Sequence, residues 1–284
     1  MIPTAFDYAA PATVDEALAA LAEAGEDAKI MAGGQSLLPV LRMRLNAPSM
    51  VIDLGRIDSL RGIREEGDDL VIGAMTTHDD VMHDALVHEH ALLLTKVTST
   101  VADPQVRHRG TFGGSLAHAD PAGDLGAAAL ALDASFVIAG SGGTRTVAAE
   151  DFFIDLFETA VGEGEILTAI RIPKHEHWGA HYEKFVRTAQ QWSIVGVAAT
   201  VHHEGGTIMD AKIGLTNMGS TPLRARATEY ALHGQFADDE SVRAAVAHIA
   251  DGTNPPSDLN GDADYRRDLA VVLARRAVLH ACGV

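Results

Sequence analysis

The sequence has little of what several classes of binding site require. It contains one cysteine, Cys282, among 284 residues. A single thiol cannot form an internal disulfide, a cysteine-rich zinc site or a four-cysteine iron–sulfur cluster. Basic residues are also few, with 22 Lys and Arg against 39 Asp and Glu and a formal net charge of −17. This charge argues against binding to nucleic acids or anionic membranes, and it favours solubility.

Long apolar runs are missing too. No stretch of the sequence approaches the roughly 20 apolar residues that cross a bilayer, and the opening MIPTAFDYAAP lacks the basic and apolar regions of a signal peptide. We therefore expect a cytoplasmic protein. The composition, 47% hydrophobic and 21% charged, is that of a globular protein long enough for two or three lobes.

The first part of the chain alternates between helix and strand patterns. Thr13 and Glu16 form a capping box for a helix that Gly25 can end, and Ser36 stands where an N-cap belongs. The patterns that follow predict these further elements: strands at 29–33, 49–55 and 68–77, helices at 37–45, 79–102 and 124–134, a hairpin at 135–149 that turns at Ser141-Gly142-Gly143, and a strand at 165–173.

The C-terminal part changes from strands to helices. After a junction at 175–180, three strands are predicted at 181–188, 194–203 and 207–217, followed by three helical segments. This order predicts a separate α+β lobe. We expect boundaries that give segments 1–55, 56–176 and 177–284.

Two glycine pairs stand out, Gly33-Gly34 and Gly113-Gly114. Each is followed within two residues by a serine and then a leucine. Glycine permits close approach of a backbone to a ligand, and N–H groups ahead of a helix can bind an anion. Two such loops predict a grip on one diphosphate, whereas each pair alone could be an ordinary turn. The sequence has neither a P-loop nor a G-x-G-x-x-G fingerprint.

These motifs carry a resemblance to a known family. The segments AGGQSLLPVLRMRLNAPSMVIDLGRI and VADPQVRHRGTFGGSLAHADPAGDL resemble the two flavin-binding motifs of the FAD-binding medium subunit of molybdenum hydroxylases, the xanthine dehydrogenase family. FDYAAPATVDEALAAL, ILTAIRIP, YEKFVR and IGLTNMGSTPLRA extend the resemblance over nearly the whole chain. It is nearest to the medium subunit of carbon monoxide dehydrogenases.

The resemblance implies a fold and a set of cofactor contacts. The implied fold is α+β: a two-subdomain FAD-binding domain of the vanillyl-alcohol-oxidase (PCMH-like) type, then a C-terminal α+β domain with a three-stranded antiparallel sheet and helices. The implied cofactor-binding residues are Ala32, Gly33, Gly34, Gln35 and Ser36 in a first pyrophosphate loop, Thr111, Phe112, Gly113, Gly114 and Ser115 in a second, the acid Asp124, the apolar Val101 and Leu167, Lys184 near the isoalloxazine, and Trp192 over the flavin ring.

Simpler interpretations exist for three of these residues. Asp124 could be a helix cap, Lys184 a solvated charge on a strand, and Trp192 a core residue. Two departures from the family pattern also stand out. Ser115 occupies the place where relatives commonly have Asn, and glutamines precede Trp192 where an acid is often found.

The 14 histidines do not predict a metal site. The clusters His88-Glu89-His90, His175-Glu176-His177 and His202-His203 lack H-E-x-x-H spacing, so we expect surface histidines and no metal. His118 and Asp120 lie near the second glycine pair, where they could take part in the site or only in loop hydrogen bonds.

The implied function is that of a flavoprotein subunit. Noncovalent FAD would receive electrons from [2Fe–2S] clusters of a small subunit, while a large subunit carries the molybdenum cofactor, and pass them to an external acceptor such as a quinone. The assembly implied is a dimer of heterotrimers. No catalytic acid or base is expected on this chain. The alternatives are a stand-alone FAD-dependent oxidase, a flavoprotein subunit for another substrate such as a purine or N-heterocycle, and a module without a redox cofactor.

Overall fold

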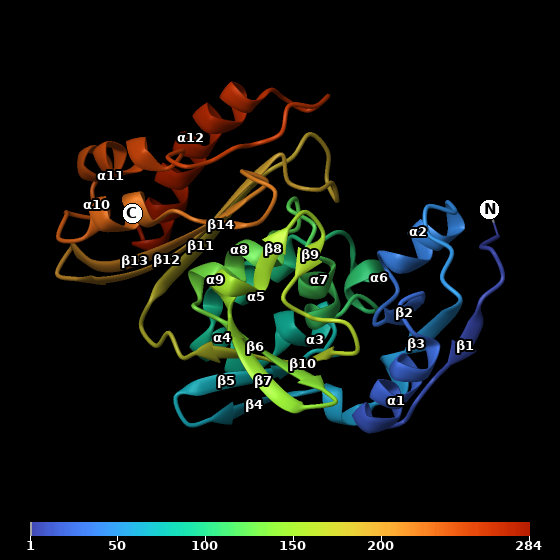
Figure 1. The fold of residues 1–284 in the computed structure, drawn as a ribbon. Coiled ribbons are helices and arrows are strands. Elements are labelled where there is room, and N and C mark those ends of the chain that lie inside the picture. The colour runs from blue at the N-terminus through green and yellow to red at the C-terminus, as the bar shows by residue number, and fades with distance from the viewer. Residues whose placement is uncertain (1) are drawn as a thin grey trace.

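The computed structural model describes residues 2–284 and contains three main sheets that follow one another along the chain. Figure 1 shows the N-terminal sheet at one end, the C-terminal sheet with its helices at the other, and the largest sheet with most of the short helices between them. The mixture of helices and strands confirms the α+β class. Among residues 2–284, no helix combines the length and apolarity needed to cross a membrane.

The first sheet is small and parallel, in the order β1-β3-β2. Half of the predicted capping box is present, because the Thr13 side chain accepts a hydrogen bond from the N–H of Glu16, whereas the Glu16 carboxylate accepts from the N–H of Ala12 and not of Thr13. Gly25 ends the helix with a φ of 70°. The elements here are β1 (Asp7–Ala9), α1 (Val14–Ala24), β2 (Ala28–Met31), α2 (Leu37–Arg42), β3 (Met50–Asp53) and the 3-10 helices η1 (Leu54–Arg56) and η2 (Asp58–Leu60).

The second sheet is antiparallel, in the order β4-β5-β10-β6-β7. The predicted hairpin is present, and residue 140 pairs with residue 143 across its turn. The strands are β4 (Ile63–Glu66), β5 (Asp69–Gly73), β6 (Ser135–Gly140), β7 (Gly143–Ala148) and β10 (Ile166–Pro173), and a separate small sheet holds β8 (Phe153–Asp155) and β9 (Glu158–Thr159).

Seven helices accompany the second sheet. The helical pattern at 79–102 is divided into three helices, because the Asp84 side chain accepts from the N–H groups of Leu86 and Val87 and so starts a new helix inside the pattern. The helices are α3 (His78–His83), α4 (Ala85–His90), α5 (Leu92–Ser99), α6 (Pro104–Arg107), α7 (Phe112–His118), α8 (Asp124–Ala131) and α9 (Ala149–Phe152).

The third sheet is antiparallel, in the order β11-β12-β13-β14. Its three long strands match the prediction, and a two-residue strand after Pro222 adds a fourth. The elements are β11 (Gly179–Phe185), β12 (Val195–Glu204), β13 (Thr207–Thr216), β14 (Leu223–Arg224), α10 (Arg226–Leu232), α11 (Asp239–Ala245), the 3-10 helix η3 (Val246–His248) and α12 (Ala263–Ala281).

Both faces of the third sheet are covered. Val195, Val197 and Val201 on β12 pack into a core shared with α12, whereas Ala198 belongs to the core of the second sheet. Helix α8 lies against β13, and α12 lies against β11 and β12, as Figure 1 shows. The strand β11 therefore joins the middle of the molecule to its C-terminal helices.

Candidate cofactor site

The two glycine motifs lie against each other, although about 80 residues separate them. A Cβ atom added to Gly33 would lie 2.1 Å from the carbonyl oxygen of Arg109, and one added to Gly114 would lie 3.0 Å from the Cβ of Ala32. Real Cβ atoms essentially never come within 3.0 Å of another heavy atom in this way. The absent side chain of Gly33 therefore makes room for the second motif, whereas an added Cβ on Gly114 would lie nearest, at 2.6 Å, to the Thr111 hydroxyl of its own motif. The two motifs are thus brought to one place mainly through Gly33.

The first motif is an irregular turn with free backbone donors. Gly34 has a φ of 74°, a left-handed conformation that favours glycine. Ser36 is the N-cap residue of α2, as predicted, but its side chain makes no capping hydrogen bond. Within residues 2–284, no acceptor lies in hydrogen-bonding position to the N–H groups of residues 33–36. Successive free amides of this kind form an anion-binding concavity.

The second motif is a helix start and not a loop, contrary to the prediction. Thr111 is the N-cap of α7, and its hydroxyl accepts from the N–H of Gly114 at 3.2 Å. The N–H groups of Phe112, Gly113 and Ser115 donate to the carbonyls of Thr76, Ala74 and Thr111. Thr111 had the residue type of an N-cap, and this local signal outweighs the tendency of glycine to break helices.

Ligand-facing groups of the second motif are consequently few. The Phe112 side chain is fully buried in the main core, and a Cβ on Gly113 would lie 2.5 Å from that of Ala74. The half-buried hydroxyl of Ser115 has no hydrogen-bond partner among the described residues. The first motif thus offers backbone N–H groups, and the second offers hydroxyl groups and a rigid support.

Asp124 and Lys184 form a buried ion pair, with 2.6 Å between Oδ2 and Nζ and side chains that are 4% and 10% exposed. The Nζ of Lys184 also donates to the carbonyl of Thr100 at 3.1 Å. The other carboxylate oxygen, Oδ1, accepts from the hydroxyls of Tyr182 at 2.6 Å and Ser193 at 2.7 Å. Lys184 is therefore not a solvated charge, and Asp124 holds α8 against the C-terminal lobe.

Tyr182 and Ser193 were not recognised in the sequence. Burial, followed by the neighbouring Asp124 charge, raises the pKa of Tyr182 well above its usual 10. The tyrosine keeps its proton and donates it in a hydrogen bond to the carboxylate. The partners of Asp124 are 58 to 69 residues away in the sequence, so no local pattern indicates them.

Trp192 lies at the surface beside this ion pair. It is 57% exposed, so it is not the core residue that its apolar neighbours could suggest. A Cβ on Gly123, the residue before Asp124, would lie 3.8 Å from a ring carbon of Trp192. The indole therefore covers the start of α8 and leaves much of its surface free to stack on a planar ligand.

The two apolar residues expected at the site, Val101 and Leu167, belong to the core of the second sheet or border it. Leu167 is 6% exposed within the core of the second sheet, and Val101 is half-buried at the edge of the same core. Asp120 mainly stabilises its own turn, since it accepts from the N–H of Ala122. Burial lowers the pKa of His118, which lies 5.2 Å from the Phe157 ring.

The expectation that the clustered histidines are all at the surface is wrong for two of them. His90 is 5% and His175 is 7% exposed, and the His90 carbonyl accepts from the N–H of His175. The Nε2 atom of His90 lies 3.2 Å from a carboxylate oxygen of Glu65. Helix α4 packs against β4 and β5, and the His175 ring lies 5.1 Å from the Trp178 ring. The contacts of His90 with Glu65 and His175 join segments far apart in the chain, so the spacing of the histidines in the sequence could not indicate the burial.

Comparisons with known proteins agree with the geometry. Residues 4–175 match the family model "FAD binding domain in molybdopterin dehydrogenase", and residues 180–281 match "CO dehydrogenase flavoprotein C-terminal domain". The carbon monoxide dehydrogenase medium chain of Hydrogenophaga pseudoflava is 41% identical over 279 residues, which are 98% of this chain and 97% of that protein. The glyceraldehyde dehydrogenase medium chain of Sulfolobus acidocaldarius is 33% identical over 98% of each chain.

Solved structures give the same result. A carbon monoxide dehydrogenase chain from Hydrogenophaga pseudoflava superposes with a TM-score of 0.97 at 43% identity, covering 100% of this chain and 99% of that one. A chain of quinoline 2-oxidoreductase from Pseudomonas putida has a TM-score of 0.95 at 36% identity, with the same coverage. The chain therefore belongs to the family of FAD-binding medium subunits of molybdenum hydroxylases, which confirms the resemblance seen in its motifs.

Proposed function

We propose that this chain is the FAD-carrying, electron-transferring subunit of a molybdenum enzyme of the carbon monoxide dehydrogenase type. The observation that carries the proposal is the contact between the two glycine motifs. It brings four N–H groups, on residues 33–36 and without acceptors among residues 2–284, to the motif that contains the Ser115 hydroxyl. A pyrophosphate requires such a set of donors, because each of its oxygens is a strong acceptor.

Different residues would bind different parts of the FAD. The amides of Gly33, Gly34 and Gln35 would hold the pyrophosphate, and Trp192 would stack on the isoalloxazine ring. When bound, FAD supplies the ability to accept electrons and pass them on. Lys184 would place positive charge near the ring, although its pairing with Asp124 largely neutralises it.

The ionisable residues expected to contact the cofactor, Asp124 and Lys184, are not free to act on a substrate. Asp124 and Lys184 are engaged with each other, and Tyr182 keeps its proton. A general base needs a free lone pair within reach of a substrate proton. These contacts favour an electron carrier over a stand-alone oxidase.

The partners follow from what the chain lacks. One cysteine cannot hold a [2Fe–2S] cluster, so the clusters would lie on a small subunit and the molybdenum cofactor on a large one. We infer a dimer of heterotrimers in the cytoplasm, with a quinone or another external electron acceptor. We also infer that the three sheets mark three folding units with boundaries near residues 55 and 176.

The substrate of the complex would be oxidised on another chain. Similarity to relatives is therefore better evidence for the identity of the substrate than the cofactor site of this chain is. Proteins named carbon monoxide dehydrogenase medium chain are 40–41% identical to this chain, against 36% for a nicotine 6-hydroxylase medium subunit. This difference favours carbon monoxide over an N-heterocycle.

The proposal is tested by the visible absorption of the purified chain, alone and with its partner subunits. We expect a flavin spectrum, and we expect denaturation to release the FAD because no covalent link is needed to hold it. Carbon monoxide added without oxygen should bleach the flavin of the complex and leave the isolated chain oxidised. Bleaching of the isolated chain by a small organic substrate would instead indicate a stand-alone oxidase, and a folded chain that never binds FAD would contradict the proposal.

A second expectation concerns Trp192. Trp192→Ala should shift the flavin reduction potential and increase flavin fluorescence, because the indole no longer covers the ring, while Trp192→Phe should preserve most of the stacking. FAD affinity should fall by roughly two- to tenfold, since an aromatic contact contributes roughly 0.5–1.5 kcal/mol. Tyr230→Ala is a matched control, because Tyr230 is also an exposed aromatic residue. Unchanged potential and fluorescence in Trp192→Ala would remove Trp192 from the site.

A further inference from the structure

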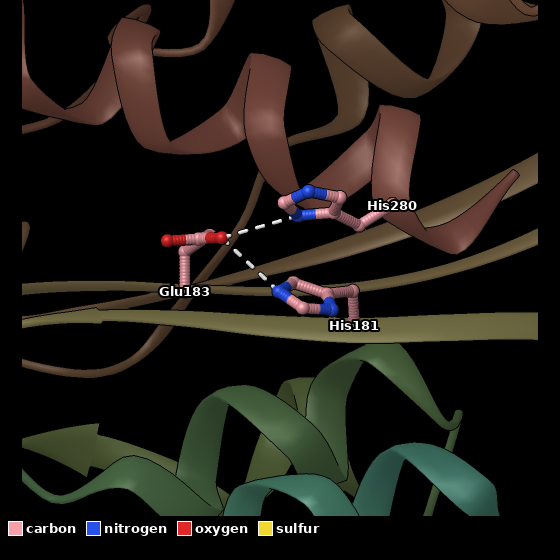
Figure 2. Close-up of side chains that lie close together, drawn as sticks. All are labelled: His181, Glu183 and His280. Atoms are coloured by element: carbon pink, nitrogen blue, oxygen red, sulfur yellow. Dashed lines mark hydrogen bonds and ion pairs between the residues drawn. The ribbon is translucent and has the colours of Figure 1, made fainter. Parts of the chain in front are cut away.

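Three ligand-type side chains meet on the C-terminal lobe, where the sequence predicted no metal site. They are His181 and Glu183 on β11 and His280 in the last turn of α12. Figure 2 shows the two histidine rings and the carboxylate turned toward one another across the space between strand and helix. One ligand atom of each residue lies within 4.8 Å of the other two.

The fold explains why the three residues converge. Residues i and i+2 of a strand lie on the same face, so Gly179, His181 and Glu183 all face α12, while Ala180 and Tyr182 face the main core. A Cβ on Gly179 would lie 1.7 Å from the carbonyl oxygen of Ala281. This glycine therefore lets the end of α12 lie directly on β11, and it brings His280 over the strand.

The distances suit a small ion bound by nitrogen and oxygen. The Nε2 of His181 is 3.0 Å and the Nδ1 of His280 is 3.4 Å from the same oxygen of Glu183. Ligands at about 2.0–2.1 Å from a tetrahedral zinc ion lie roughly 3.3 Å apart. Two imidazoles and a carboxylate, with a water in the fourth position, are a ligand set found for zinc and not for magnesium or calcium.

The charges nearby leave the carboxylate available. Among the described residues, Glu183 has no Lys or Arg partner, and the two histidines are its only ion-pair contacts. The carbonyl groups that end α12 add partial negative charge, whereas Lys96 on the neighbouring α5 opposes a cation. Burial is the main reason that the pKa of His181 lies below 6.5, which keeps a lone pair free at neutral pH.

We propose that His181, Glu183 and His280 bind one zinc ion that fastens helix α12 to strand β11. The site lies apart from the glycine motifs, and it does not depend on the proposed electron-transfer function. Bound there, zinc would stabilise the folded chain, because an ion that binds only the folded chain adds stability that grows with the logarithm of the ion concentration.

The test uses the full-length, tag-free chain saturated with FAD, because a histidine tag near Val284 would itself bind zinc. After treatment with EDTA and gel filtration, Zn²⁺ is titrated by calorimetry, and bound zinc is counted by mass spectrometry. We expect one zinc ion per chain and a higher melting temperature, with no effect of Mg²⁺. His280→Ala and Glu183→Gln should each weaken binding roughly 100-fold, since even outer partners of a ligand contribute 10- to 100-fold.

Two further variants separate metal binding from a simple hydrogen-bond cluster. His280→Cys should keep zinc binding, because a thiolate is also a zinc ligand. His248→Ala should change nothing, although His248 also lies beside a carboxylate, with Nδ1 3.2 Å from Asp251. The proposal is overturned if the folded chain binds no zinc, or if His280→Ala and Glu183→Gln bind it as tightly as His248→Ala does.

Discussion

Gly33→Val should abolish FAD binding while the chain remains folded. The valine Cβ would be placed 2.1 Å from the carbonyl oxygen of Arg109. The position of the Cβ is fixed by the backbone of residue 33, and the oxygen is itself a backbone atom, so neither can turn away as the end of a side chain can. The two motifs would have to separate, and the free amides of residues 33–36 would move with them. Loss of two such hydrogen bonds to a charged group, at roughly 1.5–3 kcal/mol each, corresponds to a decrease in affinity of about 100-fold or more.

The measurement is a titration of the FAD-free chain with FAD, followed by absorption and flavin fluorescence. Gly142→Val is the matched control, because Gly142 lies in the β6–β7 turn and has no atom within 4 Å of an added Cβ. It should bind FAD normally. Circular dichroism separates lost binding from lost folding. Wild-type affinity in a folded Gly33→Val chain would mean that the contact between the motifs does not shape the cofactor site.

The glycine pairs could be found from the sequence, but their physical reason could not. Doubled glycines indicate close approach of something to the backbone, and a ligand was the obvious candidate. For Gly33 the neighbour is the second motif itself, and for Gly113 it is Ala74. These contacts join segments far apart in the chain, and periodicity and turn signals report only on local structure.

Local signals were nevertheless reliable where one cap decided an element. Thr13 and Gly25 begin and end α1 as their residue types predict. The same reasoning applied to Thr111 would have predicted a helix start in place of a loop. The glycines that follow it drew attention away from the cap, although glycine lowers helix stability by only about 1 kcal/mol.

The metal-type cluster was missed for a related reason. The histidine clusters in the sequence were dismissed because they lack H-E-x-x-H spacing, a pattern that places two ligands on one face of a helix. His181 and Glu183 are two residues apart, and on a strand that spacing brings both side chains to one face. The third member, His280, lies about 100 residues further on. The strand predicted at 181–188 already placed the first two on one face, but only histidine clusters contiguous in the sequence were considered as metal ligands.

Asp124→Asn should destabilise the chain by about 3 kcal/mol, a typical result of removing one charge from a buried pair. Asparagine preserves the size of the side chain, and its oxygen can still accept from the hydroxyls of Tyr182 and Ser193. What is lost is the negative charge beside the Lys184 ammonium, which is only 10% exposed. Chemical unfolding of the FAD-saturated chain, measured by fluorescence and circular dichroism, gives the free energy.

The net contribution of the ion pair to the free energy of unfolding differs from the cost of removing only one of its two charges. In Asp124→Asn/Lys184→Met no charge stays buried, so much of the lost stability should return. Arg243→Ala provides the control, because the side chains of Arg243 and its partner Asp239 are 66% and 47% exposed. Exposed ion pairs of this kind contribute about 0.5 kcal/mol to stability. If Asp124→Asn costs no more than Arg243→Ala, the ion pair does not hold α8 to the C-terminal lobe. If the double variant is stable but its flavin potential is shifted, the pair has been retained for its effect on the cofactor, because stability alone would not require two charges there.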